Sequence, residues 1–176
     1  SENGIQADVD EIIVTNGCKQ AYYQALYAMT DPGDRIAVFR PYWPAYLATA
    51  ELLGLEVVLA DLPEALTPDS LAAFGKVKAL VLNNPHNPSG KVFTRQELEH
   101  ILDWAAASGT HLIVDESYEH LVFEGEHLSL AALCQGRRDW REIGIVTLFS
   151  ASQSYAMMGW RIGFALAPKH IVGAMQ

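Results

Sequence analysis

The sequence predicts an α/β fold, in which a mainly parallel β-sheet is covered by helices on both faces. Two observations support this prediction. Short β-branched or aliphatic runs alternate along the chain with longer stretches of helical periodicity. Turn-forming residues lie at the junctions, as in Asp31–Asp34, Asn83–Gly90 and Ser108-Gly109. Strands that alternate with helices are typical of parallel sheets, which are buried on both faces.

The individual elements follow this alternation in chain order. The β-branched or aliphatic runs predict strands over Ile12–Thr15, Ile36–Phe39, Glu56–Ala60, Ala79–Asn83, His111–Asp115, Ile145–Phe149 and Ile162–Ala167. Between them, helical periodicity predicts helices over Lys19–Met29, Ala45–Leu53, Pro68–Phe74, Arg95–Ala107 and Leu128–Leu133. Thr94 and Glu97 form a capping box that starts the fourth of these helices. The final residues, Ala174–Gln176, also have a helical pattern.

Length and composition restrict the class of protein. A chain of 176 residues predicts one domain over 1–176 with a core of its own, and 50% hydrophobic residues are ordinary for a soluble protein. The net charge of −9 and the scattered basic residues argue against nucleic acid as a partner. No apolar run is long enough for a membrane span, and we expect no signal peptide, because SENGIQADVDE has neither a basic start nor an apolar core. Cys18 and Cys134 form no C-x-x-C pair, so we expect a reducing, cytoplasmic location.

The residues that follow the predicted strands are the candidates for a ligand site, because ligands of parallel sheets bind beyond the carboxyl ends of the strands. Five of these segments are polar or aromatic: Asn16–Lys19, Arg40–Trp43, Asn84–Pro88, Asp115–Tyr118 and Ser150–Gln153. We expect them to converge on one edge of the sheet. That convergence is stronger evidence for a site than any single motif.

Two segments are compatible with a phosphate site. At the first, Gly17 allows close approach of an anion to the free N–H groups at a helix start, although a plain strand–helix turn explains the same pattern. At the second, serine hydroxyls and an arginine fork could complete the site, although a serine-rich loop with a surface arginine is the alternative. The residues of the second segment are Ser150, Ser152 and Arg161.

Other residues could contact a planar ligand. A carboxylate at the end of a buried strand, as at Asp115, needs a cationic partner, and Tyr118 could present a hydroxyl to the same ligand. Asn87, between two prolines, and Trp43 could supply an amide and a stacking ring, although a rigid turn and a core aromatic are the commoner roles.

Other chemistries have less support. A metal-binding or capping role is the alternative for Asp115, but no cluster with ligand spacing is visible near it, and His120 and Glu116 are the only candidates. Cys18 at a helix start could have a lowered thiol pKa, but no histidine forms a nucleophile pair with it. The chain has no G-x-S-x-G, G-x-G-x-x-G or Walker motif.

Three stretches in this order, NNPHNPSG, DESYEHLVFEGEH and SASQSYAMMGWRIGF, resemble the pyridoxal-phosphate-dependent aminotransferases of fold type I, class I/II. The likeness runs from Thr15 to about Pro168. It implies the family's large domain, a three-layer α-β-α sandwich whose mostly parallel sheet has about seven strands, the last antiparallel. The N-terminal arm and the C-terminal small domain of the family are absent from residues 1–176, so we expect a truncated chain or a fragment.

The resemblance also assigns roles to residues. It implies that pyridoxal 5′-phosphate is held at its phosphate by Gly17, Cys18, Lys19, Ser150, Ser152 and Arg161. It implies that the ring is held by Trp43, Asn87, Tyr118 and Asp115, with Asp115 pairing with the pyridine nitrogen. In the family these groups serve the transfer of an amino group from an amino acid to a 2-oxo acid, usually in a homodimer.

One residue departs from the family. Gln153 stands where the resemblance places the Schiff-base lysine, which is both nucleophile and proton shuttle, and an amide can do neither. Lys19 and Lys169 are not substitutes, since one lies in the phosphate turn and the other lies past the last strand. We therefore expect impaired catalysis and non-covalent cofactor binding. The alternatives are a non-catalytic binder of pyridoxal or pyridoxamine phosphate, and a structural or interaction fragment.

Overall fold

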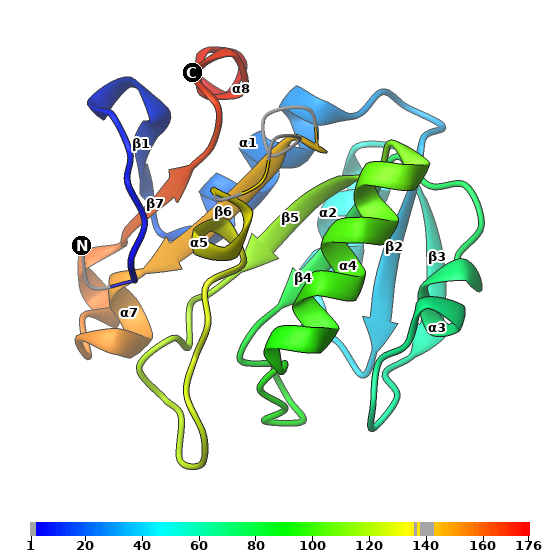
Figure 1. Cartoon of the computed structure of the whole chain (residues 1–176). Coiled ribbons are helices and arrows are strands. Elements are labelled where there is room, and N and C mark those ends of the chain that lie inside the picture. The colour runs from blue at the N-terminus through cyan, green and yellow to red at the C-terminus, as the bar shows by residue number, and fades with distance from the viewer. Residues whose placement is uncertain (1–2, 136, 138–142) are drawn as a thin grey trace.

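The computed structural model describes residues 3–135, 137 and 143–176. Its centre is a seven-stranded sheet with the order β1-β7-β6-β5-β4-β2-β3 (Figure 1). The strands are β1 (Ile12–Asn16), β2 (Arg35–Arg40), β3 (Glu56–Asp61), β4 (Ala79–Asn83), β5 (His111–Asp115), β6 (Ile145–Ser150) and β7 (Ile162–Leu166). Strands β2 to β6 pair in parallel, whereas β7 runs antiparallel to both β1 and β6. The predicted mostly parallel sheet with an antiparallel last strand is confirmed.

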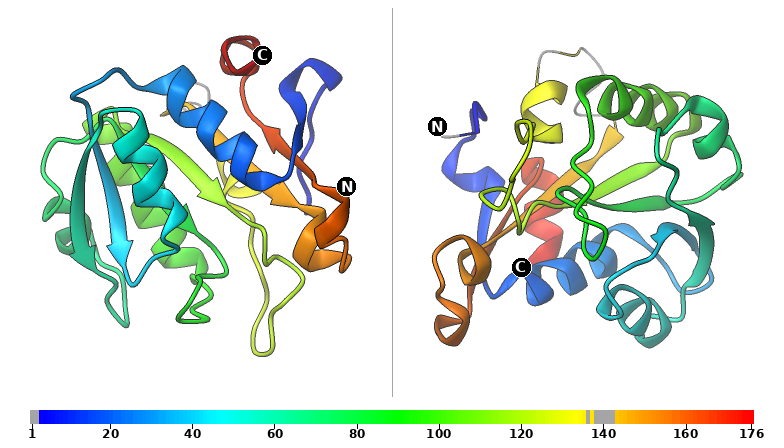
Figure 2. Two further views of the ribbon diagram at one scale, coloured as in Figure 1. Left: turned by 180° about the vertical axis from the view of Figure 1, so that it is seen from behind. Right: turned by 90° about the horizontal axis from the view of Figure 1, so that it is seen from below.

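Helices cover both faces of this sheet, as Figure 2 shows in its view from below. One face carries α1 (Cys18–Met29), α2 (Ala45–Leu52) and α8 (Lys169–Met175), and the other carries α3 (Pro68–Ala72), α4 (Arg95–Ser108) and α5 (Leu130–Cys134). Strand β2 shows why both faces need cover. Ile36 and Val38 are buried with the first set of helices, and Ala37 and Phe39 with the second. The chain is therefore the predicted three-layer sandwich.

Most element boundaries lie within a residue or two of their predicted positions, and two differences have a clear cause. The helix predicted from Leu128 begins at Leu130, because the Leu130 N–H and the Ser129 hydroxyl both donate to the Glu116 carboxylate. The segment after β6, for which no helix was predicted, contains the short helix α7 (Ala151–Ser154). Its start is capped, since the Ser150 hydroxyl accepts from the Ser152 N–H.

Short 3₁₀ helices, η1 (Val9–Glu11) and η2 (Met158–Trp160), were also not predicted. They precede β1 and β7, which pair with each other at one side of the sheet. Across the described residues, no helix combines the length and the apolar composition that a membrane crossing requires.

Candidate functional site

A cavity of about 230 Å³ lies at the carboxyl ends of the central strands. Its walls come from the segments that follow β1, β2, β4, β5 and β6, so the five polar strand ends do meet at one edge of the sheet. The lining residues are Cys18, Lys19, Trp43, Tyr46, Asn87, Asp115, Ser117, Tyr118, Ser150, Ser152, Gln153, Met158 and Arg161. All the side chains predicted for a site from the sequence are among them.

The turn between β1 and α1 is built around Gly17. This residue has φ +78° and ψ 160°, a region of backbone conformation that is essentially restricted to glycine. Because α1 begins at Cys18, the N–H groups of Cys18 and Lys19 precede the first intrahelical acceptor and have no partner inside the helix. The positive end of the helix dipole adds to their field, so this turn is suited to an anion.

Two close contacts hold this turn against the start of β7. A Cβ atom on Gly17 would lie 2.2 Å from Nη2 of Arg161, so the guanidinium group lies directly on the glycine. A Cβ atom on Gly163, in β7, would lie 2.5 Å from the backbone nitrogen of Cys18. Only glycine therefore allows β7 to cross the start of α1 and bring Arg161 to the N–H groups of the turn.

Hydroxyl and guanidinium groups complete this corner of the cavity. Ser150 and Ser152 are buried, and α7 holds both at the cavity wall. Arg161 is exposed and donates from Nη1 to the Met158 carbonyl at 3.1 Å. Its remaining N–H groups can serve an anion, since guanidinium offers a planar fork of donors.

Asp115 is the buried charge of the cavity, with only 5% of its surface exposed. Its Oδ2 accepts from the Tyr46 hydroxyl at 2.7 Å, and its Oδ1 accepts from the Ser117 N–H at 3.0 Å. The Cys18 thiol lies 3.7 Å from Oδ1. Within the described part of the chain, no lysine, arginine or histidine forms an ion pair with Asp115. A buried carboxylate without a protein cation favours a cationic ligand group in the cavity.

The same network overturns one expectation about Cys18. Burial, followed by the neighbouring Asp115 carboxylate, raises the pKa of the Cys18 thiol well above its ordinary value. The prediction of a lowered pKa was wrong, because it considered the helix start alone. Desolvation and a like charge both disfavour the thiolate, so Cys18 is a poor nucleophile here.

Trp43 contributes a flat apolar surface to the cavity wall. Its ring meets that of Tyr46 edge-on, with centroids 5.5 Å apart and an angle of 89° between the planes. The ammonium group of Lys19 lies 5.7 Å from the centre of the Trp43 ring. Lys19 therefore reaches the cavity with its side chain as well as with its backbone.

Asn87 and Tyr118 form a pair on another wall. The Asn87 amide donates to the Tyr118 hydroxyl oxygen at 2.9 Å, and the Asn87 backbone N–H donates to Asn83 at 2.6 Å. Burial, followed by the charge of Asp115, raises the pKa of Tyr118. The hydroxyl thus keeps its proton near neutral pH and can donate it to a ligand oxygen.

Gln153 lines the cavity from helix α7. Within the described residues its side chain forms no hydrogen bond, so its amide is available to a ligand. Ser152 lies beside it in the same short helix and is buried. The cavity therefore presents a neutral amide at the position where the sequence departs from the family pattern.

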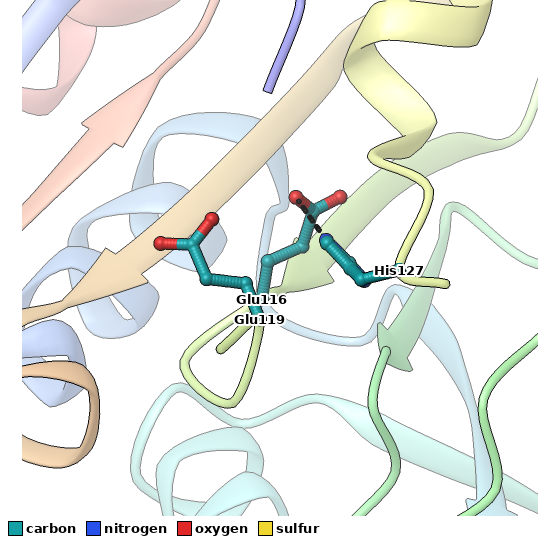
Figure 3. A group of neighbouring side chains, drawn as sticks. All are labelled: Glu116, Glu119 and His127. Carbon is teal, nitrogen blue, oxygen red and sulfur yellow. Dashed lines mark hydrogen bonds and ion pairs between the residues drawn. The ribbon is translucent and has the colours of Figure 1, made fainter. Parts of the chain in front are cut away.

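A second cluster of ionisable groups lies near the cavity. Figure 3 shows the Glu116 carboxyl group facing the His127 ring, and one ligand atom from each of Glu116, Glu119 and His127 lies within 4.8 Å of the others. Of the two candidates predicted from the sequence, Glu116 belongs to this cluster and His120 does not. His127 is the histidine of the cluster, because residues 127–130 fold back onto the end of β5.

Contacts within the protein already engage both carboxylates of this cluster. Glu116 is fully buried, and it accepts from His127 Nε2 at 3.2 Å, from the Ser129 hydroxyl at 3.1 Å and from the Leu130 N–H at 3.0 Å. Glu119 accepts from the Asn3 amide. Both carboxylates are therefore already hydrogen-bonded, and Glu116 fixes the start of α5.

Sequence reasoning missed three lining residues, Tyr46, Ser117 and Met158. Tyr46 lies within α2, three residues after Trp43, and this spacing could have placed both on one side of the helix start. Ser117 lies between two residues that were predicted. Met158 gave no signal in the sequence.

Comparisons with known proteins agree on one family. The sequence model described as "Aminotransferase class I and II" matches residues 1–176. The aspartate/prephenate aminotransferase of Thermus thermophilus is 38% identical over 99% of this chain, and an aspartate aminotransferase of Streptomyces avermitilis is 34% identical over 98%. The chain spans 45% and 43% of the lengths of these two relatives.

Solved structures give the same result. The aspartate aminotransferase from Thermus thermophilus with maleate superposes with a TM-score of 0.90 at 38% identity, covering 99% of this chain and 45% of its own. An aromatic aminotransferase from Pyrococcus horikoshii superposes with a TM-score of 0.91 at 33% identity, covering 99% of this chain and 48% of its own.

Proposed function

The chain belongs to the class I and II aminotransferases, and from this membership we propose that it is the pyridoxal-5′-phosphate-binding part of a protein that moves an amino group from an amino acid to a 2-oxo acid. We further propose that Gln153 impairs this reaction in the chain as it stands. The observation that carries the proposal is Asp115, a buried carboxylate that faces the cavity and that has no cationic partner among the residues the structure describes.

The cavity fits the cofactor group by group. The protonated ring nitrogen of pyridoxal phosphate is the kind of cation that Asp115 lacks. Trp43 offers a stacking surface for the ring, and Asn87 and Tyr118 offer hydrogen bonds to its phenolic oxygen.

The phosphate has its own set of donors. Close packing at Gly17 and Gly163 brings Arg161 to the free N–H groups at the start of α1. Ser150, at the end of β6, and Ser152, in α7, lie in the same cavity. An anion at this corner gains both fixed dipoles and a full positive charge. We propose that the phosphate binds through the N–H groups of Cys18 and Lys19 and through Ser150, Ser152 and Arg161. The Gly17 N–H, which the sequence placed with these donors, instead donates to the Thr15 carbonyl at 2.9 Å.

The family's reaction needs a basic amine beside the cofactor. Bound pyridoxal phosphate supplies an electron-withdrawing ring that stabilises negative charge on the α-carbon of an amino acid. The transfer needs a base that takes the proton from that carbon, and an amide such as Gln153 has no basic lone pair for it. Gln153 can orient a polar group by hydrogen bonding, but it cannot carry the proton.

This same residue favours a second function, which is non-catalytic binding. Phosphate, ring nitrogen and ring face can all be recognised without a covalent bond. A site with these contacts and an amide at position 153 would hold pyridoxal phosphate or pyridoxamine phosphate as a ligand. The family also supports a homodimer in the cytoplasm with amino acids and 2-oxo acids as substrates, and we include these in the proposal.

Titration with both cofactor forms tests the proposal. We expect pyridoxal 5′-phosphate and pyridoxamine 5′-phosphate each to raise the melting temperature and to give saturable binding by calorimetry. Binding with no measurable transamination supports the non-catalytic function, whereas turnover at ordinary enzyme rates contradicts the proposed role of Gln153. Failure of both ligands to bind contradicts the cofactor site as a whole and favours an interaction role.

A further inference from the structure

Tyr46 is a buried residue that lines the cavity. It lies in α2 with 3% of its surface exposed, and its hydroxyl donates to Oδ2 of Asp115 at 2.7 Å. The Ser117 N–H and the Cys18 thiol both contact Oδ1. Within the described residues, Tyr46 is therefore the one side chain that holds Oδ2 in place.

The ring of Tyr46 has a second set of contacts. It lies edge-on to Trp43 at 5.5 Å, and it also meets Tyr22, whose hydroxyl donates to the Tyr46 carbonyl at 3.2 Å. These aromatic contacts fix the orientation of both lining rings. One side chain thus contacts the carboxylate that faces the ring nitrogen and the indole that faces the ring plane.

We propose that Tyr46 is a positioning residue: its hydroxyl directs the Asp115 carboxylate at the ring nitrogen of the bound cofactor, and its ring holds the plane of Trp43. This inference rests on the proposed function. Without the hydroxyl, Oδ2 loses its donor, and the carboxylate is free to turn about its Cβ–Cγ bond.

The hydroxyl of Tyr46 keeps its proton at neutral pH and so remains a donor. Burial, followed by the charge of Asp115, raises the pKa of Tyr46 well above its ordinary value. A neutral phenol facing a carboxylate forms a charge-assisted hydrogen bond, which is stronger and shorter than a neutral one.

A pair of matched variants tests this role. Tyr46→Phe removes one oxygen and keeps the buried ring. Tyr22→Phe removes a hydroxyl from an equally buried tyrosine that touches Tyr46 but makes no hydrogen bond to Asp115. Dissociation constants are measured for two probes, pyridoxamine 5′-phosphate and benzyl phosphate, which has an aromatic ring and a phosphate but no ring nitrogen.

We expect Tyr46→Phe to weaken pyridoxamine 5′-phosphate about tenfold, the effect of losing one charge-assisted hydrogen bond. Benzyl phosphate should change by less than about twofold on the same scale, because its binding needs no oriented carboxylate. Tyr22→Phe should leave both probes nearly unchanged. Equal weakening of both probes by Tyr46→Phe, or no weakening of either, overturns the inference.

Asp115→Asn provides a second route to the same answer. In that background, Tyr46→Phe should have no further effect on the affinity for pyridoxamine 5′-phosphate, since the two residues act through one contact. Additive losses contradict the inference even if one variant is less stable. If the unaltered chain binds neither probe, the proposed function fails along with the inference; if it binds and Tyr46→Phe binds equally well, only the inference fails.

Discussion

Replacing Gly17 by alanine probes the phosphate corner of the cavity most directly. The backbone at Gly17 has φ +78° and ψ 160°, and a Cβ atom would lie 2.2 Å from the guanidinium group of Arg161. Alanine therefore has two effects, backbone strain and displacement of Arg161. Gly109→Ala is the matched control, since Gly109 has φ 69° and ψ 24° and no atom within 4 Å of the added Cβ.

The backbone strain is of similar size in the two variants, whereas only Gly17→Ala displaces Arg161. Alanine at Gly17 occupies a region that costs about 1–3 kcal/mol, whereas the left-handed helical region at Gly109 costs about 1–2 kcal/mol. The clash itself adds little to the loss of stability, because Arg161 is exposed and its side-chain end can move. Moving it removes charge-assisted hydrogen bonds to the phosphate, which contribute about 1.5–3 kcal/mol, or roughly tenfold or more in affinity.

Urea unfolding and calorimetric titration with pyridoxamine 5′-phosphate measure the two effects separately. We expect both variants to remain folded, since domains of this size are stable by about 5–15 kcal/mol. We expect Gly17→Ala to lose at least about tenfold in affinity and Gly109→Ala to bind as the unaltered chain does. Equal affinity of the two variants would refute the assignment of Gly17 and Arg161 to a phosphate site.

Three further predictions concern other groups of the site. Gln153→Lys should retain pyridoxal 5′-phosphate covalently after borohydride reduction, as measured by intact mass, and Gln176→Lys at an exposed position should not; equal labelling contradicts the placement of residue 153. Burial raises the pKa of Glu116, so ionisation of this carboxyl group opposes folding. The free energy of unfolding of Glu116→Gln should therefore rise relative to that of the unaltered chain as the pH rises above the ordinary glutamate value of 4.5. Urea unfolding across this pH range measures the difference, and a trend of opposite sign for Glu116→Gln contradicts the argument. The raised pKa of Cys18 predicts alkylation at neutral pH at least about tenfold slower in the folded chain than in urea, followed by peptide mass; equal rates contradict the burial argument.

The fold was predictable from the sequence because two periodicities alternate clearly along it. Strands such as Ala79–Asn83 and His111–Asp115 have the predicted bounds, since each is a buried apolar run between polar residues. The order of the strands does not follow from alternation, because pairing depends on contacts distant in sequence. Helix α7 was missed since four residues are too few to show a period.

The cavity was predictable in outline because the ends of parallel strands meet at one edge. That rule located Asp115 and Asn87 without knowledge of a cofactor. It could not locate Tyr46, whose backbone lies within a helix and whose hydroxyl reaches back to the strand end. Nor could it give the pKa shift of Cys18, which depends on burial and on a carboxylate distant in sequence.

The crossing of β7 over the start of α1 has a thermodynamic consequence. Gly17 follows β1 and Gly163 lies in β7, two strands that are distant in sequence but paired in the sheet. An anion bound between the α1 turn and Arg161 therefore contacts segments that adjoin both strands. Separation of β7 from β1 would then release the ligand. Any ligand of this corner should therefore protect the edge of the sheet against local opening, by about 2.7 kcal/mol when its free concentration is about 100 times its dissociation constant. Amide hydrogen exchange along β1 and β7 should report occupancy even when no reaction takes place.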